Sequence, residues 1–176
     1  EYKKNLRAQA LSLNPDLQNP IAIKDDEEFL STVVLGKEGK LVLNPAKAAT
    51  INHVAKTIEE LLLTYDVDGI HFDDYFYPSG GIETKYDTAD YEAYKLSGGN
   101  LSIKDWRRDN VNRMIENVHE GLKKLLDNTG KKVDFGISPF GVWRNANQDI
   151  NGSATQAGCT NYDDLYADVR LWLKEG

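Results

Sequence analysis

Two adjacent aspartates, Asp73 and Asp74, are the residues of this sequence best suited to acid–base or nucleophilic chemistry. They end the short run Asp68-Gly69-Ile70-His71-Phe72-Asp73, which reads as a strand. Because side chains alternate along a strand, His71 and Asp73 share one face, opposite the apolar residues. An unpaired carboxylate pointing inward is costly, so Asp73 is the stronger candidate for a functional role. For Asp74, on the other face, capping of the next turn is an equally good explanation.

Two other strand-like runs also end in polar residues. Asn44 follows Leu41-Val42-Leu43, and Ser138 follows Phe135-Gly136-Ile137. In parallel α/β folds the active site lies at the carboxyl ends of the strands. We therefore expect Asn44 and Ser138 to lie close to His71 and Asp73 at one end of the sheet. There His71 would orient Asp73 or a ligand hydroxyl.

Aromatic and donor residues follow the same strands and suggest a carbohydrate ligand. They are Tyr75, Phe76, Tyr77, Phe140, Trp143, Arg144 and Asn145. Aromatic faces stack on the C–H faces of sugar rings, while polar neighbours bind the hydroxyls. For Phe76 and Phe140, anchoring of the loops explains the residue type almost equally well. Trp143 is the better candidate for sugar contact, because two donors follow it directly.

Composition narrows the classes of function. The 176 residues include 21 basic and 28 acidic side chains, and the resulting net charge of −7 argues against nucleic-acid binding. The single cysteine, Cys159, cannot form an internal disulfide. No apolar run approaches the roughly 20 residues of a membrane span. We expect no cofactor, and a metal site at His71, Asp73 and Asp74 is a weak alternative because no second histidine lies nearby.

The elements that must position these residues alternate between strands and helices. We expect strands at residues 40–44, 68–73 and 134–138, a weaker one at 21–23, and long loops at 79–84 and 145–160. We expect helices at 46–65, 88–96, 102–126 and from 162 to the end, with a capping box at Ser102 and Asp105 and a terminator at Gly130. This order is typical of βαβ units and predicts an α/β fold with a parallel sheet.

Several stretches of the chain together resemble the bacterial glycosyl-hydrolase-like 10 family. They are Leu43-Asn44-Pro45, the run from Asp66-Val67-Asp68-Gly69 to Phe76-Tyr77-Pro78, Asp105-Trp106-Arg107-Arg108 through Asn112, Phe135-Gly136-Ile137-Ser138-Pro139-Phe140-Gly141 through Trp143-Arg144-Asn145, Gly152-Ser153 with Thr155, and Tyr162-Asp163-Asp164-Leu165-Tyr166-Ala167-Asp168. The resemblance is dense from about residue 41 onward and loose over the first forty residues.

The resemblance implies a (β/α)₈ barrel of an exported or lipid-anchored bacterial protein, and some family members are implicated in cleaving peptidoglycan glycan strands. The pattern is also similar to that of the α-amylase clan, in which a strand ending in Asp-Gly-x-Arg-x-Asp presents a nucleophilic aspartate. This similarity places His71 at the arginine position and Asp73 at the nucleophile.

The second carboxyl group is harder to assign. Glycoside hydrolysis normally uses two, about 5–5.5 Å apart for retention or about 6.5–9.5 Å apart for inversion. In the α-amylase clan this acid comes from the next strand, but residues 135–141 contain no acid, so Asp74 takes the acid role by default. Glu83, Asp87 or a residue outside this chain are the alternatives.

We therefore expect a glycoside hydrolase-like domain acting on a bacterial cell-wall (peptidoglycan) or other extracellular glycan, located outside the cell or at its envelope. One alternative is a non-catalytic glycan-binding module, and another is a metal-dependent hydrolase or deacetylase using His71, Asp73 and Asp74.

The length also carries an expectation, because a (β/α)₈ barrel typically needs about 250 residues. We expect residues 1–176 to form a single unit holding three or four βα units of a partial TIM-type barrel. Residues 1–39 are rich in loops, and residues 40–176 carry the barrel motifs. An open half-barrel leaves strand edges unpaired, so we expect self-association.

Overall fold

The structure is a computed structural model that describes residues 33–35, 41–74, 76–78 and 87–175. The expected strand at 21–23, the expected loop at 79–84, and the candidates Tyr75 and Glu83 lie outside the described residues. The elements, in chain order, are β1 (Val33–Leu35), β2 (Leu41–Leu43), α3 (Ala48–Thr64), β3 (Gly69–Phe72), α4 (Thr88–Leu96), α5 (Ile103–Thr129), β4 (Asp134–Ile137) and α6 (Val169–Glu175).

The long helix α5 begins and ends where the sequence predicts. At its start, the Ser102 hydroxyl oxygen accepts the Asp105 backbone N–H at 3.2 Å and donates to the Asp105 carboxylate at 2.6 Å. The bond from Ser102, followed by that from Arg108, lowers the pKa of Asp105. At its end, Gly130 has φ 72° and donates its N–H to Leu126 at 2.7 Å. A side chain makes this left-handed conformation costly, which is why a glycine ends the helix.

β3 and β4 form the predicted parallel pair. Gly69 lies opposite Asp134, and Phe72 lies opposite Ile137. The Ser138 N–H continues the ladder by donating to the Phe72 carbonyl oxygen at 3.0 Å. The connection between the two strands contains α4 and α5, as expected for a βαβ unit. The fold is therefore mixed α/β with a small parallel sheet.

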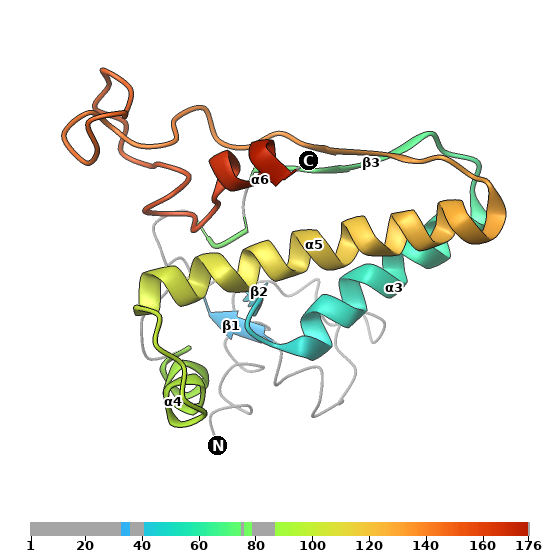
Figure 1. Ribbon diagram of the computed structural model, residues 1–176, viewed down its shortest axis with the longest axis horizontal. Coiled ribbons are helices and arrows are strands. Elements are labelled where there is room, and N and C mark those ends of the chain that lie inside the picture. The colour runs from blue at the N-terminus through green and yellow to red at the C-terminus, as the bar shows by residue number, and fades with distance from the viewer. Residues whose placement is uncertain (1–32, 36–40, 75, 79–86, 176) are drawn as a thin grey trace, which may run out of the picture.

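The apolar faces of β3 and β4 pack against the two long helices, as the alternation predicts. Ile70 and Phe72 contact a buried cluster formed by Leu62 of α3 with Val118 and Leu122 of α5. A second cluster joins α3 and α5 to the loop after β3 and to residues 165–167. In Figure 1, α5 runs through the middle of the structure, with α3 on one side and β3 and β4 on the other. Because the helices cover one face of the sheet, His71 is exposed on the other.

The partners of β2 differ from the prediction. β2 pairs antiparallel with β1, which lies in the stretch predicted to be rich in loops, and Val34 lies opposite Val42. In the described residues β2 therefore belongs to a separate two-stranded sheet and not to the parallel one. The signal for this pairing was present in the sequence, because two short runs of valine and leucine separated by five residues with two glycines favour a hairpin.

The prediction of a helix from residue 162 onward was wrong at its start, because α6 begins only at Val169. Local hydrogen bonds explain the delay. The Asp164 carboxylate accepts the Thr160 N–H at 2.7 Å and Tyr166 takes φ 55°, so the chain turns before it can form a helix. Asp168 then caps the helix by accepting the Leu171 N–H at 3.2 Å. The expected loop at 145–160 is confirmed, since no helix or regular strand lies in it.

Candidate active site at the ends of the parallel strands

Three of the predicted site residues meet at the carboxyl ends of β3 and β4. The Ser138 hydroxyl donates to Asp73 Oδ1 at 3.2 Å, and its oxygen lies 2.9 Å from His71 Nε2. All three residues are exposed. The structure therefore forms a hydrogen-bonded chain, His71–Ser138–Asp73, open to solvent at the end of the sheet where parallel α/β folds place their active sites.

The Ser138 hydroxyl can donate to only one of its two neighbours. A serine hydroxyl carries one hydrogen, and that hydrogen is given to Asp73. The oxygen of Ser138 must therefore accept a hydrogen from His71 Nε2. In this arrangement the Asp73 carboxylate accepts from Ser138, and Ser138 is in turn hydrogen-bonded to His71.

A glycine beside the histidine makes room for this arrangement. Gly136 lies opposite His71 in the register of the two strands. A Cβ atom at position 136 would lie 3.2 Å from His71 Nδ1, which is closer than ordinary side-chain contact. Gly136 was not among the predicted site residues, although a glycine inside a strand often marks a close approach of the backbone to another group.

Asp74 lies in different surroundings from Asp73. Burial raises the pKa of the Cys159 thiol, and the charges of Asp164 and Asp74 raise it further. Asp74 thus lies within electrostatic reach of Cys159, whereas Asp73 is bonded to Ser138. The two carboxylates point to different neighbours, as the alternation along the strand predicts.

The Asn44 side chain forms hydrogen bonds with the turn that follows β2 and with α4. It is 2% exposed, its Oδ1 accepts the Ala46 N–H at 3.0 Å, and its Nδ2 donates to Asp90 Oδ2 at 3.0 Å. Lys47 forms a salt bridge with the same Asp90 at 2.5 Å. No hydrogen bond among the described residues joins Asn44 to the His71–Ser138–Asp73 chain, and its contacts are those of a residue that orders a turn.

Trp143 and Arg144 take part in a cluster of stacked rings and guanidinium groups. The Arg170 guanidinium lies 3.4 Å from the centre of the Trp143 ring, and Tyr162 meets the same ring edge-on at 5.7 Å. Arg144 forms salt bridges with Asp163 at 2.7 Å and with Asp149 at 3.0 Å. The hydrogen bond to Asp163 raises the pKa of Arg144 despite an opposing effect of desolvation.

Asn145 holds the loop that follows. It is 6% exposed, and its Oδ1 accepts from the Thr155 hydroxyl and from the Ala157 N–H, both at 2.8 Å. Its Nδ2 donates to the Ala157 carbonyl at 3.0 Å. All described polar contacts of its side chain are therefore used within the loop at 145–160.

Tyr77 lies in the core. It is 1% exposed and meets the ring of Tyr166 at 4.9 Å. Burial, with a smaller effect from the nearby Asp87 charge, raises the pKa of Tyr77 far above its ordinary value. The contacts of Tyr77 are those of a residue that anchors the loop after β3.

A buried ion pair beside Tyr77 was not predicted from the sequence. Arg107 donates from Nε and Nη2 to both carboxylate oxygens of Asp87 at 2.7 Å, and from Nη1 to the Tyr166 hydroxyl at 2.7 Å. Asp87 is 0% and Arg107 4% exposed. Burial alone would lower the pKa of Arg107, but the bonds to Asp87 raise it above its ordinary range. Asp87 is therefore occupied in the core, which removes it from the candidate acids.

The described residues contain no group of three His, Cys, Asp or Glu side chains that could hold a metal ion. The metal-dependent alternative at His71, Asp73 and Asp74 therefore gains no support from their arrangement. None of the described helices is both long and apolar enough to cross a membrane.

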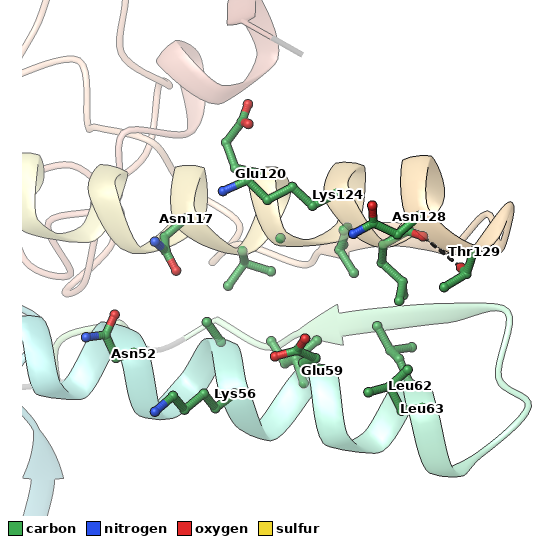
Figure 2. A pocket seen from close by; sticks show the side chains of 16 residues that line it. Asn52, Lys56, Glu59, Leu62, Leu63, Asn117, Glu120, Lys124, Asn128 and Thr129 are labelled. Atoms are coloured by element: carbon green, nitrogen blue, oxygen red, sulfur yellow. Dashed lines mark hydrogen bonds between the residues drawn. The ribbon is translucent and has the colours of Figure 1, made fainter.

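A groove of about 420 Å³ lies elsewhere, between α3 and α5 (Figure 2). Its floor includes Leu62, Val118 and Leu122, and its rim carries charged residues such as Lys56 and Glu59. None of the predicted site residues lines it. The groove is thus separate from the candidate active site.

Known proteins similar to this chain are glycosyl hydrolases by name. "Glycosyl hydrolase YngK" of Bacillus subtilis (strain 168) is 45% identical over 138 residues, which cover 78% of this chain and 26% of the relative. "Glycosyl hydrolase DigH" of Escherichia coli (strain K12) is 38% identical over 139 residues, covering 78% of this chain and 30% of the relative. The chain therefore spans less than a third of the length of these relatives.

The sequence profile of the family described as "Glycosyl hydrolase-like 10" matches residues 7–176. The match includes both strands of the parallel pair and all three residues of the hydrogen-bonded chain. With nearly the whole sequence covered, the chain belongs to the glycosyl hydrolase-like 10 family.

Proposed function

We propose that this chain contributes the catalytic aspartate of a glycan-cleaving (β/α)₈-type barrel, with Asp73 as the nucleophile or charge-stabilising carboxylate. The observation that carries the proposal is the position of Asp73. It is exposed at the carboxyl end of a parallel strand, and Ser138, itself bonded to His71, donates to one of its oxygens. Among the described residues, no hydrogen bond occupies the other oxygen, which leaves it to face a sugar.

The proposed reaction breaks the bond between the anomeric carbon and the glycosidic oxygen. Asp73 stabilises the positive charge that develops on the sugar ring, or bonds to the anomeric carbon, while a carboxylic acid protonates the departing oxygen. Water then supplies the hydroxyl of the new reducing end. Asp74 is the described residue that we propose for the acid, since Asp87 is paired with Arg107 in the core.

The proposed substrate is a bacterial cell-wall (peptidoglycan) or other extracellular glycan, and the proposed location is outside the cell or at its envelope. Membership of a glycosyl hydrolase-like family supports a glycan substrate. The segment after β4 supports it further, because it carries Trp143 beside the cationic Arg170, and aromatic and cationic groups suit sugar rings and their charged substituents.

The test uses the intact protein that carries this chain. Release of reducing ends from purified peptidoglycan and from soluble β-linked oligosaccharides would be measured beside calorimetric binding of the same oligosaccharides. Turnover of any of these glycans supports the proposal. Binding without turnover would favour a glycan-binding module, and the absence of both would contradict a role in glycan recognition.

The edges of the parallel pair lead to a proposal of self-association. Within the described residues, β3 and β4 have only each other as hydrogen-bonded neighbours. Unpaired strand edges favour pairing with a further strand, so we expect the isolated 176-residue chain to self-associate through them. Sedimentation of this chain over a range of concentrations measures the effect, and a monomer at every concentration would contradict it.

A further inference from the structure

We infer that three aromatic residues near the end of the chain, Tyr162, Tyr166 and Trp172, hold the loops of the candidate active site in place. Each is bound by a polar residue of α5, and each contacts an aromatic residue that follows β3 or β4. We call these three chains of contacts the aromatic ties. The inference rests on the proposed function of Asp73, because the held loops begin at that site.

The first tie runs from Arg107 through Tyr166 to Tyr77. Arg107 is held by Asp87 and donates to the Tyr166 hydroxyl at 2.7 Å. The Tyr166 ring contacts Tyr77 at 4.9 Å in an edge-on geometry. Tyr77 is three residues after Asp74, so this tie anchors residues 76–78, the described part of the loop that leaves the candidate carboxylates.

The second tie reaches the other loop, after β4. Arg108 donates to the Tyr162 carbonyl at 2.8 Å, and its guanidinium lies 3.9 Å from the centre of the Tyr162 ring. Tyr162 in turn meets the Trp143 ring edge-on at 5.7 Å. Trp143 lies five residues after Ser138, so this tie fixes the loop that leaves the hydroxyl donor of Asp73.

The third tie returns to the loop after β3. The Trp172 indole N–H donates to Asn112 Oδ1 at 2.8 Å. The Trp172 ring contacts Phe76 edge-on at 5.2 Å, and Phe76 is 6% exposed. Two adjacent residues of one loop, Phe76 and Tyr77, are therefore anchored by two different ties.

The ties give a role to the motif Asp105-Trp106-Arg107-Arg108 through Asn112 of α5. Catalysis as proposed uses none of these residues, yet Arg107, Arg108 and Asn112 each hold one aromatic ring. Tyr166 has the only positive φ among the described non-glycine residues, at 55°. Such a conformation is costly and persists only where the surroundings enforce it. Here the bond to Arg107 and the packing on Tyr77 do so.

We assign Tyr166 and Asn112 as positioning residues, acting on Asp73 through the loop and not by contact with a sugar. Small displacements of catalytic groups can cost about 10²-fold in rate. The structure therefore predicts that cutting a tie, while leaving the rings in place, lowers kcat more than it changes KM.

The experiment compares two pairs of variants in the intact protein. Tyr166→Phe removes only the hydroxyl that binds Arg107, and its control is Tyr65→Phe, an exposed tyrosine after α3. Asn112→Ala removes the acceptor of Trp172, and its control is Asn117→Ala, an exposed asparagine of the same helix. The second pair keeps the test decisive if Tyr166→Phe fails to fold.

Two measurements are made on each variant. Hydrogen exchange followed by mass spectrometry reports on the loops, and we expect the peptides covering residues 73–78 to exchange about ten-fold faster in both tie variants but not in the controls. Peptides from α3 should be unchanged. Turnover of purified peptidoglycan should fall by about ten-fold or more in kcat, with KM within about two-fold.

The two measurements separate the possible failures. If the intact wild-type protein has no turnover on any glycan, the proposed function fails, while hydrogen exchange still decides whether the ties hold the loops. Unchanged exchange in both tie variants, or faster exchange spread over the whole chain, would overturn the inference. An equal fall in kcat for the controls would overturn it as well.

Discussion

The Asp73→Asn variant of the intact protein is expected to lose glycan cleavage by at least about 10³-fold, as is usual when a catalytic carboxylate or base is removed. The amide is nearly the same size and can still accept the Ser138 hydrogen bond, but it carries no negative charge. It can neither bond to an anomeric carbon nor stabilise a cationic sugar ring. The loss should therefore fall on the rate of the chemical step.

The same variant should unfold at nearly the wild-type temperature. Asp73 is exposed, and surface substitutions usually change stability by less than about 0.5 kcal/mol. Reducing-end assays and thermal unfolding measure the two effects. The matched control is Asp134→Asn, which removes an exposed carboxylate at the start of β4, away from Ser138. This variant should leave glycan cleavage and the unfolding temperature unchanged. Full activity in Asp73→Asn would rule out the assignment of Asp73.

The Asp87→Asn variant is expected to lose about 3–5 kcal/mol of unfolding free energy. Both oxygens of the Asp87 carboxylate accept from Arg107 at 2.7 Å, and both residues are almost completely buried. Without the carboxylate, the Arg107 charge stays in a region with little water and has no counter-charge. Removing one partner of a buried pair is costly for this reason.

Urea unfolding of matched variants tests this expectation. Asp109→Asn breaks the exposed ion pair with Arg113 on the same helix and should cost less than about 1 kcal/mol. The double variant Asp87→Leu/Arg107→Met removes both buried charges and should regain most of the loss. Equal costs for Asp87→Asn and Asp109→Asn would show that the buried pair contributes no more than a surface pair.

The fold was predictable where the signal is local. The alternation of Ile70 and Phe72 with His71 and Asp73 gave the buried and exposed faces of β3 correctly, because a strand has a fixed period of two. The limits of α5 followed from Ser102 and Gly130, whose bonds lie within one turn of the helix ends. The pairing of β2 was not predicted, because it depends on which other strand lies beside it.

The candidate site was predicted in part for the same reason. His71, Asp73 and Ser138 meet as expected, because strand direction and side-chain alternation suffice to bring them together. The residues in the loops were harder, because a loop has no fixed period. Arg144 was expected to face a sugar, and its salt bridges with Asp149 and Asp163 were not predicted.

The sequence by itself determined the βαβ order, the family, and the end of the sheet at which the aspartate lies. Only the tertiary structure decided which polar and aromatic groups bind each other. Arg107 reaches Asp87 twenty positions away and Tyr166 fifty-nine positions away. Such pairs depend on how helices and loops pack, and no local periodicity encodes that packing. The candidate carboxylate, Asp73, is thus visible in the sequence, whereas the contacts of Phe76 and Tyr77 in the segment after it appear only when the chain is folded.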